Sequence, residues 1–559
     1  MQIMKAIHAA AFALAVILTS AAGAVDLPNP GFEQPGEANL PEGWGFYNWG
    51  TAGSDGVSSR STEFANSGEA SLQSDSRDGS SRPGVYTRVP LQPGRYAIRF
   101  FARAENGRKA LVRAYLADRY SPPLLVTDRW TKVEFEHSVN QKRLNAEINI
   151  QHFGGEPGSV WFDDLELVRL PSVRAKVIPD PRDPDIQPKM LYFCGNTNYA
   201  AQTARTWVRR GFAGFFHSYL FHDWITDIWS LDDDPDQDEE DRLLGEVRQA
   251  LNQSAEQGLS RNVLKVAFYT QLPDPADDEA WGLLTSNFRE GARFARLAGF
   301  RMLAIDTEYV SEQYRYDWEG YNEFEGGREA LAAKTRVRWR TVGGVLAEEL
   351  ADVDLGILPE GMIYYGPLWT ELFAGLLEGL EEGQYPGKVH VFCEGTYSER
   401  DPDNIRDHAA AVRSTARALL DGRALESWDK RGRVALAAWP LGYYREVKDA
   451  QGKFLGWSGR EETFGNEIVG SYADKSARYP VEEFEIQLAA IRTYSDDYCW
   501  IYGHGASWWQ VTPEQADQLS GKLQYFSRDN YLVPVAENID AFYEAAGQRN
   551  IIQFVPQED

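Results

Sequence analysis

The chain has 559 residues, of which 83 are acidic and 57 basic, and its formal net charge at pH 7 is −26. Because one domain typically has ~150 residues, this length predicts at least two domains, and the 43% hydrophobic and 13% aromatic content excludes a largely disordered chain. The acidic surface disfavours nucleic acid and anionic membranes as partners. Three cysteines exclude a disulfide framework and a zinc site of four thiolates.

Residues 1–24 have the pattern of a secretory signal. Lys5 precedes a run from Ala6 to Leu18 that is apolar except for His8, and Ala22-Gly23-Ala24 supplies small side chains for cleavage. The alternative is an uncleaved membrane anchor, but the run is shorter than the ~20 residues that a spanning helix needs. We therefore expect a secreted or periplasmic protein with no membrane span after signal cleavage.

Residues 25–170 form the first predicted domain. Short segments that alternate apolar and polar side chains, such as 96–100 and 145–150, are separated by Pro-Gly turns. This period of two is typical of half-buried strands, and many such strands at regular spacing predict an all-β sandwich of two sheets.

The same domain contains motifs at its start, middle and end: Asn29-Pro30-Gly31-Phe32-Glu33, Trp44, Ser67-Gly68 before Ala70-Ser71-Leu72, residues 91–96 and residues 161–167. In these motifs it resembles the jelly-roll carbohydrate-binding modules of families 4, 9 and 22. The resemblance implies a structural calcium ion held by Glu33 and by Asp163 or Asp164, since carboxylates suit this cation. Turn hydrogen bonds are the alternative use of these side chains, and related sandwiches also serve as spacers or bind proteins.

Residues 171–189 contain five prolines among charged side chains and show no sustained apolar period. This composition predicts a semi-rigid linker between two domains.

From residue 190 to residue 559, β-rich runs alternate with stretches that have helical periodicity. The runs are eight in number and cover 190–195, 211–218, 263–271, 302–308, 354–360, 388–394, 433–439 and 498–504. Eight such units predict an α/β TIM (β/α)8 barrel that follows the jelly-roll sandwich. The alternative, an open doubly wound sheet, usually carries a Gly-rich phosphate loop after its first strand, and Gly195-Asn196-Thr197-Asn198 is not one.

Carboxylates end several of the predicted barrel strands, where the active site of this fold lies. Alternation places Asp306 and Glu308 on the inward face of the fourth strand and Glu394 at the inward end of the sixth, and Glu360 ends the fifth. Glycoside hydrolysis needs two carboxylates, and we predict Glu308 as the proton donor, Glu394 as its partner and Asp306 as a neighbour that tunes Glu308. The alternative is that these acids cap helices or bind loop amides.

The sequence Ile305-Asp306-Thr307-Glu308-Tyr309 resembles the end of the fourth strand in family-18 chitinase-type barrels. The resemblance implies a proton-donating Glu308 and an Asp306 that steers an acetamido group of the substrate. Ala304 and Arg301 replace two further aspartates of that family, so no glycosidase family is assigned to the barrel.

Aromatic and polar side chains near the strand ends are candidates for substrate binding, because sugar rings stack on aromatic faces. The predicted substrate-binding residues are Glu360, His217, Tyr269, Gln271, Trp439, His504, Trp508 and Trp509. The two adjacent tryptophans follow small residues in a predicted loop and are expected to be exposed.

Together these features predict a secreted glycoside hydrolase that cleaves a poly- or oligosaccharide without a catalytic cofactor. One alternative is a polysaccharide lyase, which needs a Tyr, His or Lys base and a group that neutralises a uronate, and the shortage of inward basic residues counts against it. The other alternative is a non-catalytic glycan-binding surface protein.

Overall fold

The computed structural model describes residues 23–49, 55–77, 81–117, 119–121, 123–139, 142–155, 157–171, 173–195, 197–217, 237–267, 272–307, 324–360, 367–397, 399–440, 444–448, 454–459, 480–503, 508 and 539–556. The chain divides into two compact units. One runs to Lys176 and includes the residues from Phe554 onward, and the other runs from Val177 to Gln553. None of the described helices is long and apolar enough to span a membrane.

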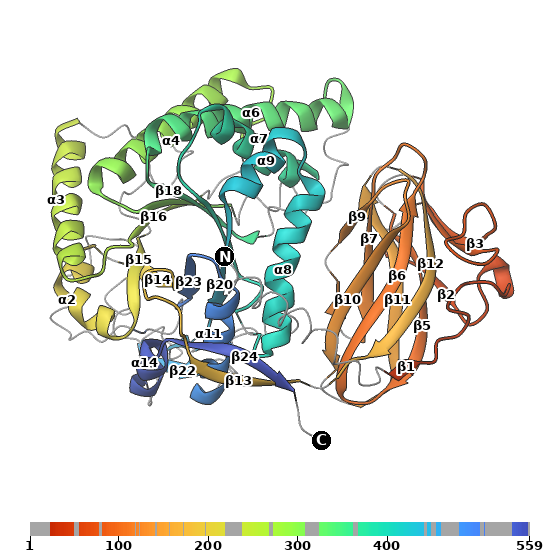
Figure 1. Cartoon of the computed structure of the whole chain (residues 1–559). Coiled ribbons are helices and arrows are strands. Elements are labelled where there is room, and N and C mark those ends of the chain that lie inside the picture. Colours follow the sequence, from red (N-terminus) through yellow and green to blue (C-terminus); the bar gives the residue numbers. More distant parts are fainter. Residues whose placement is uncertain are drawn as a thin grey trace, which may run out of the picture. The chain divides into compact units, whose positions relative to one another are not determined.

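The first unit is a sandwich of two mainly antiparallel sheets, as predicted (Figure 1). One sheet has the order β10 (Thr131–Val139), β6 (Gly94–Ala104), β12 (Gly158–Arg169), β4 (Ser71–Ser76) and β3 (Gly56–Ser61), with β1 (Gly23–Val25) beside β12. The other has the order β2 (Gly45–Asn48), β5 (Pro83–Leu91), β11 (Arg143–Gly155), β7 (Ala110–Leu116) and β8 (Arg119–Tyr120), with β9 (Leu124–Val126) beside β7.

Alternating side chains of both sheets fill the space between them. Ile98 and Phe162 come from one sheet and Ile148 from the other, and all three are fully buried. Phe32 and Trp44 of the opening motifs join this core with ring centroids 5.4 Å apart. Most of the predicted signal lies outside the described residues, but β1 begins at Gly23, two residues before the predicted start of the domain.

Residues 171–189 are not a simple linker, which corrects the prediction. They contain β13 (Val173–Pro179), which pairs with β24 (Asn550–Pro556) near the end of the chain. The amide N–H of Asp180 extends this pairing with a 2.8 Å hydrogen bond to the Arg549 carbonyl. The prolines suggested an unpaired segment. Pairing with a strand more than 350 residues away leaves no local signal in the sequence that could have corrected this expectation.

The second unit contains a closed barrel of parallel strands, which confirms all eight predicted runs. In order around the barrel the strands are β14 (Lys189–Gly195), β15 (Phe212–His217), β16 (Val263–Ala267), β17 (Met302–Asp306), β18 (Asp354–Leu358), β19 (Val389–Cys393), β20 (Gly432–Ala438) and β23 (Tyr498–Ile501).

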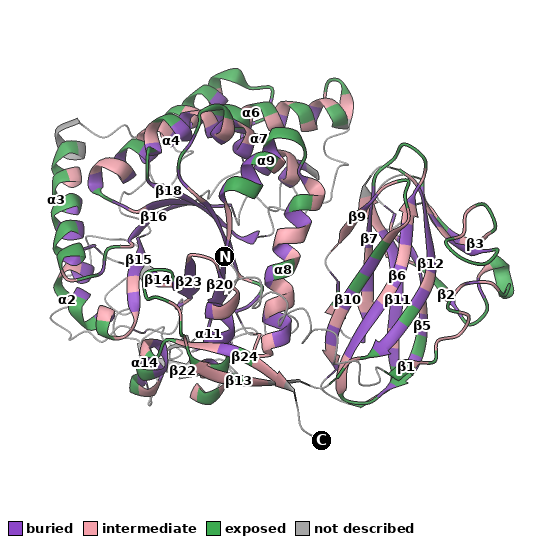
Figure 2. Cartoon of the chain, in the orientation of Figure 1, coloured by how far each residue is buried: buried purple, intermediate pink, exposed green. Residues whose placement is uncertain are grey.

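Helices follow the barrel strands and surround them (Figure 1). They are α2 (Thr197–Arg209), α3 (Gln237–Glu256), α4 (Asp278–Ala298), α6 (Gly327–Leu350), α7 (Pro367–Glu382), α8 (Pro402–Leu419), α9 (Gly422–Arg431), α11 (Val481–Tyr494) and α14 (Ile539–Gly547). A hairpin of β21 (Tyr444–Lys448) and β22 (Phe454–Gly459) is inserted after β20. Figure 2 shows the strands buried and the outer faces of the helices exposed.

The barrel interior is packed with side chains. Phe216, Phe392 and Trp500 come from three different strands, and their ring centroids lie 4.9 to 5.9 Å apart. Gly356 faces them, and a Cβ atom there would lie 2.9 Å from both Ala304 and Phe392. Because side chains alternate along a strand, these contacts identify the inward positions of every strand involved.

Candidate active site

The carboxyl ends of the barrel strands bring together several of the predicted site residues. Asp306 is the last residue of β17, and Glu394 and Trp439 each follow directly after a strand, β19 and β20. Glu360 lies two residues after β18. The predicted residues Glu308, Tyr269, Gln271, His504 and Trp509 lie outside the described residues.

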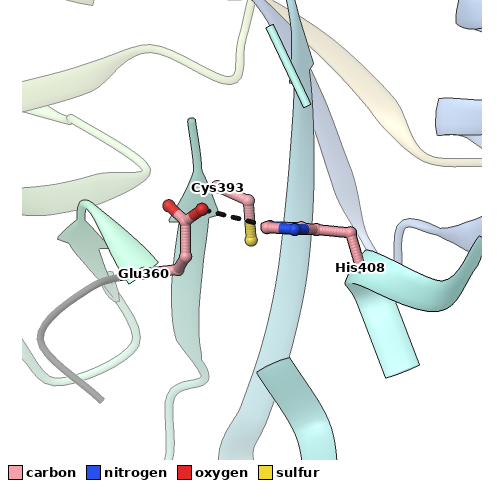
Figure 3. A group of neighbouring side chains, drawn as sticks. All are labelled: Glu360, Cys393 and His408. Carbon is pink, nitrogen blue, oxygen red and sulfur yellow. Dashed lines mark hydrogen bonds and ion pairs between the residues drawn. The ribbon is translucent and has the colours of Figure 1, made fainter. Parts of the chain in front are cut away.

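Glu360 accepts hydrogen bonds from three N–H groups, and Figure 3 shows the one with His408. Its Oε2 accepts the backbone N–H of Glu394 at 2.8 Å, and its Oε1 accepts the N–H of Gly395 at 2.9 Å. His408 Nε2, from α8, lies 3.0 Å from Oε1. Burial favours the neutral acid, but the hydrogen bonds and charge of His408 and the two amides outweigh it and hold the pKa of Glu360 below its usual value.

This environment corrects the predicted role of Glu360 in substrate binding. The residue is 3% exposed, and both carboxylate oxygens are engaged by neighbouring N–H groups. With a lowered pKa it is also a poor proton donor at neutral pH. The structure therefore supports the alternative considered for these acids, in which a strand-end carboxylate binds loop amides.

Cys393 completes a group of possible metal ligands with Glu360 and His408, since one ligand atom of each lies within 4.8 Å of the others. Burial and the nearby Glu360 carboxylate raise the pKa of the Cys393 thiol well above its usual value. A metal ion needs the thiolate, and Glu360 already accepts three N–H groups. In the structure Glu360 and His408 bind each other, and the Cys393 thiol donates to the carbonyl of Val391 at 3.7 Å, so the three side chains do not form an open ligand set.

Glu394 begins a tightly held turn and is half-buried. Its carbonyl accepts the N–H of Tyr397 at 2.9 Å. Within the turn, Thr396 Oγ1 donates to the carbonyl of Ala437 at 2.8 Å, and Gln487 of α11 donates to the carbonyl of Thr396 at 3.0 Å. The backbone that carries the Glu394 side chain is thus fixed to the neighbouring strands and to a helix.

Asp306 forms an ion pair inside the barrel that sequence reasoning missed. Its Oδ2 lies 2.6 Å from Lys265 Nζ, and both residues are buried. Lys265 belongs to β16 and pairs in register with Ala304, which confirms that it shares the inward face with Asp306. Its Nζ also lies 5.4 Å from the ring centroid of Phe193. The signal in the sequence was a lysine at the centre of an otherwise apolar strand.

Three aromatic rings, Tyr397, Trp439 and Tyr502, form an aromatic wall at the ends of β19, β20 and β23. The centroid distances are 5.6 Å between Tyr397 and Trp439, 4.8 Å between Trp439 and Tyr502, and 5.0 Å between Tyr397 and Tyr502. Trp439 is buried, whereas Tyr502 is partly exposed. The wall shares the turn that starts at Glu394, so aromatic faces and a carboxylate lie at the same end of the barrel.

His217, a predicted substrate-binding residue, is buried away from the aromatic wall. His217 follows the inward Phe216, so its ring points outward, where Nε2 lies 3.1 Å from Asn262 Oδ1 and the ring packs edge-on against Phe300. Burial lowers the pKa of His217 to about 4, although the Asn262 hydrogen bond opposes this shift. The ring is therefore part of the core between strands and helices.

Trp508 was expected to be exposed, and this is wrong, because its side chain is fully buried. Its ring contacts Phe484 of α11 and Phe542 of α14 with centroid distances of 5.9 and 6.1 Å. Its carbonyl accepts a hydrogen bond from the Tyr543 hydroxyl. Helices α11 and α14 thus cover Trp508, although the small residues that precede it in the sequence predicted an open loop.

The carboxylates predicted to hold calcium in the sandwich all accept hydrogen bonds. Glu33 Oε1 accepts the N–H of Glu69 at 3.0 Å, Asp163 Oδ2 accepts the N–H of Asn66 at 2.6 Å, and Asp164 Oδ2 accepts Asn66 Nδ2 at 2.7 Å. Burial raises the pKa of Asp163 to about 6, opposed by its amide donors. These contacts are the predicted alternative, turn hydrogen bonds, and the calcium site remains a prediction.

One face of the sandwich combines aromatic rings with buried amides. Tyr47, Gly84, Gln151 and Arg113 form a row across β2, β5, β11 and β7 and therefore share a face. Tyr47 is half exposed. Among the described residues, neither amide atom of the fully buried Gln151 has a hydrogen-bond partner. The exposed Tyr47 ring is the part of this row that suits a ligand stacking on aromatic faces, whereas the Gln151 amide lies beneath the surface.

No family model matches the chain, and no curated protein is detectably similar to it. Among solved structures, the CBM22-1 xylan-binding domain from Paenibacillus barcinonensis Xyn10C is 18% identical, with a TM-score of 0.21, and the match covers 27% of this chain and 97% of that domain. The CBM22-1-GH10 modules of the Clostridium thermocellum endo-1,4-β-D-xylanase 10B, complexed with xylohexaose, are 9% identical, with a TM-score of 0.31, over 91% of this chain and 95% of theirs.

Proposed function

We propose that this protein is a glycoside hydrolase that acts on a poly- or oligosaccharide. The observation that carries the proposal is the placement of Glu394, a half-buried carboxylate on a rigid turn at the carboxyl end of the barrel, beside an aromatic wall that suits a sugar ring. The inward Asp306 lies at the end of β17, two strands away around the barrel. Acidic and aromatic side chains at one barrel end are what glycoside hydrolysis requires.

In this mechanism Glu308 donates a proton to the leaving oxygen, and Glu394 attacks the sugar or activates water. Glu308 lies two residues after Asp306 in the sequence. Lys265 offsets the charge of Asp306 within the barrel and holds its carboxylate in place. No cofactor is needed for this chemistry.

We further propose that the sandwich binds glycan through the face that carries Tyr47 and Gln151, and that the protein is secreted or periplasmic. A structural calcium ion at Glu33 and Asp164 belongs to the same proposal. Calorimetry of the full chain with calcium and with chelator tests the ion, and retention on insoluble glycans by wild type and a Tyr47→Ala variant tests the face, because the Tyr47 side chain is exposed.

The central test measures hydrolysis of natural glycans and of activated aryl glycosides by Glu394→Gln and Glu308→Gln. Loss of a general acid or base lowers kcat by about 10²-fold or more, and Glu394→Gln is expected to lose activity on both substrate types. Glu308→Gln is expected to retain activity on aryl glycosides, whose leaving groups depart without protonation. The exposed Glu426 of α9 supplies a matched control, Glu426→Gln. Normal activity of a folded Glu394→Gln variant overturns the assignment.

Lys265 favours a second candidate, a polysaccharide lyase, because it places a basic side chain inside the barrel where few were expected. A lyase releases unsaturated sugars that absorb ultraviolet light, whereas a hydrolase does not. Absorbance measured during digestion of uronate-containing glycans separates the two.

A further inference from the structure

We propose that Glu360 and His408 form a positioning pair that fixes the backbone of Glu394 so that its carboxylate faces the substrate. This inference rests on the proposed function, because it assigns these two buried side chains to the support of Glu394. Neither contacts the substrate itself, since Glu360 is 3% exposed and the His408 side chain is 15% exposed.

The contacts form a chain from α8 through the end of β18 to the end of β19, and Figure 3 shows its first link, between His408 and Glu360. The two Glu360 oxygens each accept one of two successive N–H groups, those of Glu394 and Gly395. Two bonds to neighbouring peptides fix both the position and the rotation of that backbone. His408 binds Oε1 at 3.0 Å and so sets the direction of the Glu360 carboxylate.

Gly395 is suited to this close approach. A Cβ atom at this position would lie 2.4 Å from His408 Cε1 and 2.8 Å from Glu360 Oε1, closer than side chains tolerate. Glycine therefore lets the Glu360 carboxylate and the imidazole ring reach the backbone directly after Glu394.

The opposite end of the same strands provides an internal comparison. Asp354, the first residue of β18, accepts the N–H of Lys388 with Oδ1 at 3.0 Å, and His390 lies 3.6 Å from its Oδ2. This pair also joins β18 to β19 through a carboxylate and an amide, but it lies at the amino ends of the strands. A structural role alone predicts similar consequences for loss of either carboxylate, whereas a positioning role predicts that only Glu360 affects turnover.

The experiment combines kinetics with hydrogen exchange on the full-length protein. In Glu360→Gln the side-chain amide has one acceptor, so at least one of the two N–H groups loses its partner. We expect at least one additional fast-exchanging amide in a peptide that contains residues 394 and 395, and a fall in kcat of about 10- to 100-fold with little change in KM, because small displacements of reacting groups cost this much. Asp354→Asn is the matched control and is expected to keep kcat.

His408 supplies a second pair of variants, which keep the test decisive if Glu360→Gln does not fold. His408→Gln retains an N–H donor at a similar distance and is expected to keep kcat within about threefold, whereas His408→Leu removes the donor and is expected to behave like Glu360→Gln. Unchanged exchange and unchanged kcat in folded Glu360→Gln and His408→Leu variants overturn the proposal. Stoichiometric zinc in the purified protein that is lost in Cys393→Ser also overturns it, in favour of a metal site.

The two proposals fail in different ways. If Glu394→Gln keeps full activity, the proposed function at this site is wrong. The exchange rates of the residue 394 and 395 amides still show whether Glu360 and His408 fix this backbone. If Glu394→Gln is inactive while Glu360→Gln and His408→Leu keep both kcat and slow exchange, only the positioning role is wrong.

Discussion

The Lys265 ammonium lies 2.6 Å from the Asp306 carboxylate inside the barrel, and the two residues are 5% and 7% exposed. A buried ion pair of this kind depends on both members, because removal of one leaves the other charge in a poorly solvating interior. The pair joins β16 to β17 at the end of the barrel that carries Glu394.

The first prediction concerns this ion pair. Lys265→Met is expected to lower the free energy of unfolding by about 3–5 kcal/mol, because Asp306 loses its ammonium partner. The double variant Lys265→Met/Asp306→Asn removes both charges and is expected to recover more than half of that loss. Urea titrations of the three proteins measure this, and a double variant no more stable than the single one would contradict it.

The second prediction concerns Trp508, whose buried ring leaves a large cavity when it is removed. Trp508→Ala is expected to cost about 3–5 kcal/mol of stability, while KM of the remaining folded protein stays close to wild type. Trp508→Phe, which keeps an aromatic ring against Phe484 and Phe542, is expected to cost less. A stable Trp508→Ala protein with a raised KM would instead restore the stacking role.

The third prediction concerns Trp439 in the aromatic wall. Trp439 is buried, and its ring packs against the partly exposed Tyr502 with centroids 4.8 Å apart. If sugar rings stack on Tyr502, Trp439→Ala removes the support of that ring and raises KM more than it lowers kcat, since stacking acts on bound substrate and transition state alike. Trp161, a buried tryptophan of the sandwich, gives the comparison variant Trp161→Ala, which changes stability without changing hydrolysis of short soluble substrates. Equal KM values for wild type and Trp439→Ala would place the ring outside the substrate path.

The fourth prediction is a pH dependence caused by His217. Its pKa is about 4 in the folded protein, compared with the ordinary histidine value of 6.5 that applies to the unfolded chain. Between pH 4 and pH 6.5 the unfolded chain therefore binds a proton that the folded protein does not. Stability is therefore lost as the pH falls from about 6.5 toward 4, and His217 accounts for about 2 kcal/mol of the loss at pH 5. His217→Gln keeps the contact with Asn262 without titrating, and its urea midpoint is expected to fall less between pH 7 and pH 5. Parallel pH curves for the two proteins would rule out this contribution.

The fifth prediction is that residues 25–170 fold alone. All the strands of both sandwich sheets except β1 start and end within this range, and the core between the sheets comes from the same residues. A cooperative melting transition of this fragment confirms the prediction, and an unfolded fragment would show that the sandwich needs residues beyond its own sheets. A matched fragment that starts at Gly23 measures the contribution of β1.

The sequence predicted the barrel and the inward face of its strands because both depend on local periodicity. Alternation alone placed Asp306 correctly, as its contact with Lys265 demonstrates. The role of Glu360 could not be assigned from the sequence, because its partners lie 34 to 48 residues away, and two of the three are backbone amides that carry no residue identity. Burial of Trp508 likewise depends on helices that only the tertiary structure brings together.

The pairing of β13 with β24 means that residues 177–553 enter and leave their compact unit at adjacent points. A segment whose two ends meet can be transplanted as a cassette, because a host loop needs to open by only the width of a strand pair to accept it. The same geometry allows a permuted gene in which a short linker joins β24 to β13 and new termini are opened in an exposed surface loop. The pairing of β13 with β24 would therefore allow the barrel to be moved into another protein without the module that precedes it.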